Sequence, residues 1–119
     1  MITAVHEKRK AALEAELARI LPLLIHEYGA EKVIIFGSLA TGEVGEWSDL
    51  DLVIIKETEK KSMNRIDDVA RLTRPRLAAD VVVYTPAEFE RMSEGRRFFR
   101  EEVVAKGRVV YDAGMAAVV

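Results

Sequence analysis

VIIFGSLATGEVGEWSDLDLV, residues 33–53, contains two apolar runs separated by a polar segment with three glycines. Residues 32–36 are mostly β-branched or aromatic, which predicts a strand that stops at Gly37-Ser38. The segment from 42 to 48 reads as a loop, and residues 50–55 form a second predicted strand. Polar residues therefore stand where the first strand ends and where the second begins.

Two carboxylates enter the second predicted strand. Asp49 and Asp51 alternate with Leu50 and Leu52, and side chains two residues apart in a strand point to the same face. Two negative charges on one face repel each other unless cations hold them. Carboxylate oxygens suit Mg²⁺, which binds through one or two carboxylates together with substrate phosphates. The alternative is that one Asp caps a turn and the other is solvated.

The pair Gly37-Ser38 stands directly after the first strand and is expected to open a short helix. Glycine lets the backbone approach a ligand closely, and free amides at a helix start, with a hydroxyl beside them, make a small phosphate cradle. The alternative is an ordinary turn.

The rest of the chain predicts alternating helices and strands. Apolar residues at helical spacing from Leu13 to Tyr28 predict an amphipathic helix that Pro22 kinks or splits and that closes near Gly29. The other predicted elements are a helix around 66–73, a strand over 79–84, a helix that starts with the capping box Thr85-Pro86-Ala87-Glu88, a helix over 98–105 and a strand over 108–111.

Asp80 lies at the start of the otherwise apolar strand 79–84. It is either a strand-end charge or, if this strand lies beside that of Asp49 and Asp51, the third member of a carboxylate triad. Three carboxylates that converge on two metal ions about 3.5–4 Å apart are the arrangement for in-line nucleotidyl transfer.

Taken in order, these features resemble a known family. Gly37-Ser38, ten intervening residues, Asp49-Leu50-Asp51 and a distal Asp80 closely resemble the minimal nucleotidyltransferases of the DNA polymerase beta superfamily. The likeness runs from about Leu17 to Asp112, and the segments 33–40, 48–53, 81–89 and 107–111 are also similar to that family.

The resemblance implies an α+β (mixed α/β) fold, with a small mixed β-sheet flanked by helices and the site at one edge of the sheet. It implies transfer of a nucleoside monophosphate, AMP from ATP or from another nucleoside triphosphate, with release of pyrophosphate. Thr41 stands where many members carry Arg, which is expected to weaken nucleotide binding. The implied roles are nucleotide binding by Gly37, Ser38 and Ser48, and binding of two Mg²⁺ ions by Asp49, Asp51 and Asp80, with Asp80 also helping to activate the attacking hydroxyl.

Length and composition limit the remaining interpretations. The 119 residues are expected to form a single domain, 1–119, and 50% hydrophobic with 32% charged residues is typical of a soluble globular protein. The net charge of -2 gives no long-range attraction to nucleic acid or to anionic membranes. Cysteine is absent, and no signal peptide or membrane-spanning run is recognised, so a cytoplasmic location is expected.

The resemblance also implies a partner. Minimal nucleotidyltransferases often act as antitoxins of helical HEPN proteins, and some adenylylate a tyrosine of the toxin. Two alternatives stay open: a non-catalytic module that neutralises its partner by occlusion, and a transferase for a small acceptor such as an aminoglycoside. Self-association is also open. Trp47 is expected to stack on a base or to cover the edge of the core, and Phe98 and Phe99 to be core or interface anchors.

Overall fold

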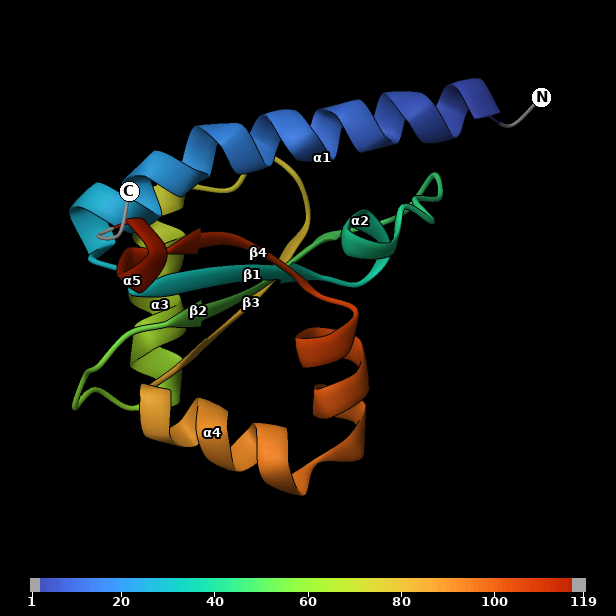
Figure 1. The fold of residues 1–119 in the computed structure, drawn as a ribbon. Coiled ribbons are helices and arrows are strands. Elements are labelled where there is room, and N and C mark those ends of the chain that lie inside the picture. The colour runs from blue at the N-terminus through green and yellow to red at the C-terminus, as the bar shows by residue number, and fades with distance from the viewer. Residues whose placement is uncertain (1–2, 117–119) are drawn as a thin grey trace.

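The computed structural model of the chain describes residues 3–116, which form one four-stranded sheet with helices around it (Figure 1). The strands are β1 (Lys32–Phe36), β2 (Leu50–Ile55), β3 (Ala79–Tyr84) and β4 (Arg108–Asp112). The helices are α1 (Thr3–Leu23), the π-helical η1 (Leu24–Tyr28), α2 (Ser38–Thr41), α3 (Ser62–Thr73), α4 (Pro86–Gly95), the π-helical η2 (Phe99–Ala105) and α5 (Ala113–Ala116).

The sheet is mixed and has the strand order β3-β2-β1-β4. β1 runs antiparallel to both β2 and β4, whereas β2 and β3 are parallel. The parallel pair needs a crossover connection, and α3 supplies it. The predicted α+β fold, with a small mixed sheet flanked by helices, is confirmed.

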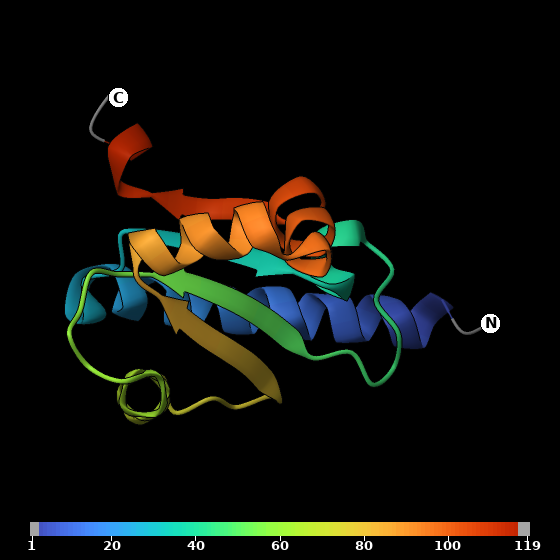
Figure 2. The same ribbon diagram turned by 90° about the horizontal axis from the view of Figure 1, so that it is seen from below.

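Helices cover both faces of the sheet. Seen from below, α4 and η2 lie in front of the strands and α1 lies behind them (Figure 2). The alternation of side chains along β2 fits this arrangement, because Leu50 and Leu52 belong to the core beneath α1 and α3, while Val53 belongs to the core beneath α4 and η2. The two buried cores share the sheet as their common wall.

The first helix is longer than the sequence predicts. It begins at Thr3, well before Leu13, and Pro22 does not split it. Instead the chain passes into a π-helical turn at Leu24, two residues after the proline that removes a backbone donor. The helix closes at Gly29, as predicted, with φ 80° and its amide donating to the Leu24 carbonyl. Among residues 3–116, no helix is both long and apolar enough to cross a membrane.

The predicted capping box joins three elements. Thr85 Oγ1 accepts the Glu88 amide at 3.2 Å, and Glu88 Oε1 accepts the Thr85 amide at 2.7 Å. The same carboxylate accepts from Arg65 Nη1 at 2.6 Å, and this buried guanidinium also donates to the Val83 carbonyl at 3.1 Å. Glu88 therefore ties α4 to α3 directly and to β3 through Arg65.

The predicted helix over 98–105 is present as the π-helical η2. A Cβ atom at Gly107 would collide with the Val103 carbonyl and come within 3.0 Å of the Ile34 side chain. Glycine at this position therefore lets the end of η2 pack directly on β1, close to the start of β4.

Candidate active site

Asp51 and Asp80 lie directly opposite each other in the parallel ladder of β2 and β3. Neighbouring strands are about 4.8 Å apart, so the two carboxylates belong to adjacent positions of one sheet surface. Asp49 precedes β2 by one residue and lies two positions before Asp51. The strand adjacency that a carboxylate triad requires is therefore present.

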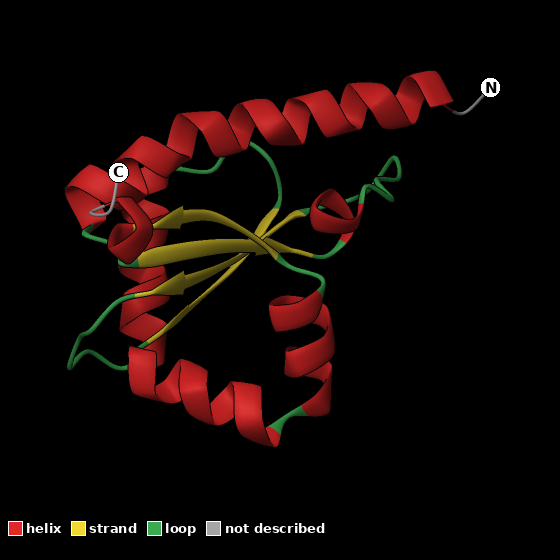
Figure 3. Cartoon of the chain, in the orientation of Figure 1, coloured by secondary structure: helices red, strands yellow, loops and turns green. Residues whose placement is uncertain are grey.

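Asp51 and Asp80 also lie on the same face of the sheet. Asp51 alternates with Val53, and Asp80 with Val82, and both valines pack with the core beneath α4 and η2. Both Asp residues stand at the start of their strands, at the end of the sheet where β1 stops and α2 begins (Figure 3).

The electrostatics of the site connect all three carboxylates. Partial burial, followed by the charges of Asp80 and then Asp49, raises the pKa of Asp51 from 3.8 to about 6. Asp49 and Asp80 are themselves exposed. The cluster therefore has an excess of negative charge that a bound cation would relieve.

The carboxylates do not form a ready-made metal cage. Within the described part of the chain, no three His, Cys, Asp or Glu side chains meet the geometry of a metal site. The structure brings Asp51 and Asp80 together and leaves Asp49 beside them. Such an open set of hard oxygen donors fits Mg²⁺, which takes its remaining ligands from substrate phosphates and water.

Gly37 is in direct contact with this cluster. Its dihedral angles, φ 72° and ψ -151°, lie in a region that is essentially restricted to glycine. A Cβ atom there would collide with a carboxylate oxygen of Asp51, which follows from the pairing of Phe36 with Asp51 across β1 and β2. Any other residue at position 37 would push the carboxylate away.

The short helix predicted after Gly37 is present as α2. The Gly37 carbonyl accepts the amides of Ala40 at 3.1 Å and Thr41 at 3.2 Å, which closes the turn. The Thr41 hydroxyl donates back to the Ser38 carbonyl at 3.3 Å. Thr41 therefore stabilises its own turn, and Ser38 is the residue that opens it.

The loop before Asp49 is held by internal contacts. Ser48 Oγ accepts the Gly45 amide at 2.8 Å, and the Ser48 carbonyl accepts Arg9 Nε at 2.9 Å. The hydroxyl of Ser48 thus supports its own loop, and its contact with nucleotide stays a prediction. Trp47 is 84% exposed, so the interpretation that it covers the edge of the core is wrong.

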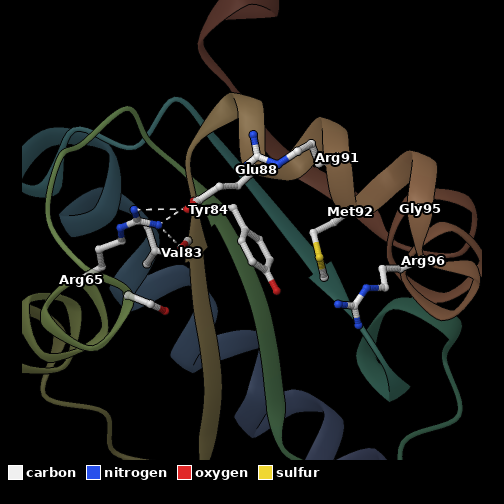
Figure 4. A pocket seen from close by; sticks show the side chains of 9 residues that line it. Arg65, Val83, Tyr84, Glu88, Arg91, Met92, Gly95 and Arg96 are labelled. Atoms are coloured by element: carbon white, nitrogen blue, oxygen red, sulfur yellow. Dashed lines mark hydrogen bonds and ion pairs between the residues drawn. The ribbon is translucent and has the colours of Figure 1, made fainter.

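Two cavities lie on the carboxylate face of the sheet. One, of about 440 Å³, is shown in Figure 4, where Tyr84, Met92 and Arg96 project into the space between α4 and the strands. The other, of about 220 Å³, shares these three residues and extends to Phe36 and Val53. The two cavities adjoin through these shared residues and are together called the groove beneath α4. None of the three carboxylates lines the groove; the smaller cavity comes near them at Val53, which is two residues from Asp51 on the same face.

The aromatic residues beside the groove divide into two roles. Phe99 is buried and packs edge-on against Tyr84, with ring centroids 5.6 Å apart. Phe98 lines the smaller cavity and is 70% exposed. The sequence does not single out the groove, because Tyr84 lies in β3, Met92 in α4 and Arg96 just after α4, and the three form no local motif.

Comparisons with known proteins agree with this geometry. The model of the family "Polymerase beta, Nucleotidyltransferase" matches residues 18–114. The fold is also similar to the crystal structure of a candidate nucleotidyltransferase from Sulfolobus solfataricus, with a TM-score of 0.65 and 19% identity over 92% of this chain and 89% of that one. No curated protein matches the sequence. The family match includes every element that carries the carboxylates, and the chain therefore belongs to the polymerase beta nucleotidyltransferase family.

Proposed function

We propose that this protein transfers a nucleoside monophosphate, AMP from ATP, to a hydroxyl group of a partner protein and releases pyrophosphate. The observation that carries the proposal is the register of β2 and β3, which sets Asp51 opposite Asp80 with Asp49 beside them. The family match supports nucleotidyl transfer in general. ATP as the nucleotide and a protein hydroxyl group as the acceptor are what we propose beyond this match.

The donor chemistry of the site fits two Mg²⁺ ions. Asp49, Asp51 and Asp80 would hold them, and the pKa of Asp51 is raised first by partial burial and then by the charges of Asp80 and Asp49, which such ions would neutralise. When bound, the ions would neutralise the triphosphate and align the attacking and departing oxygens.

The protein's own groups have separate tasks in this scheme. Gly37 has no side chain beside Asp51, which leaves room for the Asp51 carboxylate to lie against the turn. The Ser38 hydroxyl and the first amides of α2 would hold the triphosphate. Asp80, exposed at the start of β3, would accept a hydrogen bond from the attacking hydroxyl.

The acceptor would approach along the groove beneath α4. This groove lies on the same face as the carboxylates, and the exposed Phe98 at the smaller cavity gives a protein partner an aromatic anchor. A helical HEPN-type protein, with this chain as its antitoxin, is the proposed partner.

The proposal is tested by incubating the protein, Mg²⁺ and ATP labelled at the α-phosphate with a lysate of its source organism. An Asp49→Asn, Asp51→Asn variant runs in parallel. Label on a protein band with the wild type alone supports the proposal, and mass spectrometry then identifies the modified hydroxyl. If no macromolecule is labelled, also with the other nucleotides and with a purified helical partner encoded nearby, then transfer is refuted and neutralisation by occlusion is favoured.

A further inference from the structure

Helix α1 lies on the face of the sheet opposite the carboxylates, yet it contacts both segments that lead into them (Figure 1). Two sets of hydrogen bonds make these contacts. One joins α1 to the connection between α3 and β3, and the other joins it to the loop before β2.

The first set centres on the buried Glu16, which is 5% exposed. Its carboxylate accepts Arg19 Nε at 2.7 Å and Arg19 Nη2 at 2.9 Å, and it also accepts the Arg76 amide at 2.6 Å. Arg19 Nη2 in turn donates to the carbonyls of Thr73 at 2.9 Å and Arg74 at 3.2 Å. One ion pair thus holds three backbone groups of a four-residue segment.

This segment, residues 73–76, contains a residue in an unfavourable backbone conformation. Arg74 has φ 43°, in the left-handed region that residues other than glycine seldom adopt. Such a conformation persists where the surrounding contacts enforce it. The Glu16–Arg19 pair supplies contacts of this kind on both sides of Arg74.

The position of this segment fixes the start of β3. Two residues beyond Arg76, the Ala78 carbonyl accepts the Leu50 amide at 3.0 Å, which begins the ladder that sets Asp80 opposite Asp51. A shift of the segment would therefore move Asp80 relative to Asp51.

The second set holds the other side of the site. Arg9 Nε donates to the carbonyl of Ser48, the residue directly before Asp49, at 2.9 Å. Arg9 and Glu16 are two helical turns apart and so lie on the same side of α1. One rigid helix is thereby connected to the backbone next to Asp49 and to the backbone leading to Asp80.

We infer that Arg9 and the Glu16–Arg19 pair are positioning residues, which set the spacing between the carboxylates without touching the substrate. The inference rests on the proposed function, because it assumes that the carboxylates bind divalent ions. It predicts that loss of these contacts weakens metal binding in a protein that is still folded.

The test is Mn²⁺ binding, measured by electron paramagnetic resonance at a temperature where circular dichroism shows every variant to be folded. The test variants are Arg9→Met and Glu16→Gln, and Arg9→Lys is the conservative variant. The matched controls are Lys10→Met and Glu14→Gln, which alter exposed neighbours on the same helix.

The Mn²⁺ dissociation constant is expected to rise about tenfold in Arg9→Met and in Glu16→Gln, which is the scale found for groups that orient metal ligands. It should return toward the wild-type value in Arg9→Lys and stay unchanged in both controls. Test variants that lose thermal stability but bind Mn²⁺ as the wild type does would overturn the inference and leave the proposed function standing. A wild type that binds no Mn²⁺ would refute the proposed function and the inference with it.

Discussion

Replacing Asp51 by Asn is expected to stabilise the metal-free protein while abolishing nucleotidyl transfer. The pKa of about 6 in the folded protein exceeds the ordinary 3.8, and the full difference corresponds to about 3 kcal/mol. Because the carboxyl group is only partly buried, solvent screening reduces the expected effect to about 1 kcal/mol. For a domain of this size, that stabilisation raises Tm by roughly 4 °C.

The sign of the effect depends on pH. The unfolded chain ionises Asp51 near pH 3.8, whereas the folded chain retains the proton until about pH 6. The wild type therefore loses stability as the pH rises through this interval, and the loss is complete above it. The gain from Asp51→Asn should be full at pH 7.5 and nearly absent at pH 3.5.

The measurement is guanidinium unfolding followed by circular dichroism, in EDTA, at both pH values. Glu59→Gln, which removes an exposed charge on the loop between β2 and α3, serves as the control and should change little. Adding Mg²⁺ at pH 7.5 should stabilise the wild type more than the Asn variant. A variant that is less stable than the wild type at pH 7.5 in EDTA, or equally stabilised at both pH values, would refute the reasoning.

Three further predictions concern the elements around the carboxylates. Gly37→Ala should destabilise the protein by about 2 kcal/mol, because the backbone at position 37 has a positive φ, and it should abolish Mn²⁺ binding, because the new Cβ collides with the Asp51 carboxylate. Denaturant unfolding measures the first effect and metal titration the second. Glu16→Ala should cost about 2 kcal/mol above pH 4.5, since it removes charge-assisted bonds to Arg19 and the Arg76 amide. These bonds hold the pKa of Glu16 at about 2, below its ordinary 4.5, so the charge-dependent part of the difference should be lost as the pH falls from 4.5 through that value, and a difference that does not shrink over this interval would contradict this account. Arg96→Glu, in the groove, should reduce labelling of the acceptor about tenfold by reversing a charge at the docking surface, with Mn²⁺ affinity unchanged; equal labelling would exclude the groove.

Local sequence signals predict the strands well. Runs such as 32–36, 50–55 and 79–84 are apolar and rich in β-branched residues, and the structure has β1, β2 and β3 with these bounds. The capping box at Thr85 is equally local, because both of its hydrogen bonds span three residues. Where the residues that determine an element lie within that element, the sequence alone predicts it.

Long-range features lack such signals. Residues 4–12 are exposed or half-buried and have little apolar periodicity, so the start of the helix is missed. The bonds of Arg9 to Ser48 and of Glu16 to Arg76 span 39 and 60 residues. No pattern within either partner predicts them, and the groove beneath α4 depends in the same way on how distant elements pack.

The sequence also predicts the carboxylates more readily than their arrangement. Asp49 and Asp51 are paired by strand alternation, which is a local property. The place of Asp80 beside them depends on a parallel crossover through α3, and the family resemblance implies that strand order whereas no local pattern of residues does. The contact of Asp51 with Gly37 likewise depends on long-range pairing, because it requires the antiparallel register of β1 and β2.

The carboxylates and the groove depend on different elements of the fold, and this separation has an evolutionary consequence. The carboxylates depend for their position on the strands, on the turn at Gly37 and on the segments that α1 contacts from behind the sheet. The groove in front is walled by α4 and η2. If the acceptor docks there as proposed, substitutions in these two helices would alter which molecule docks while the carboxylates stay in place. Related chains could diversify their acceptors by changing one layer of the fold and retaining the other.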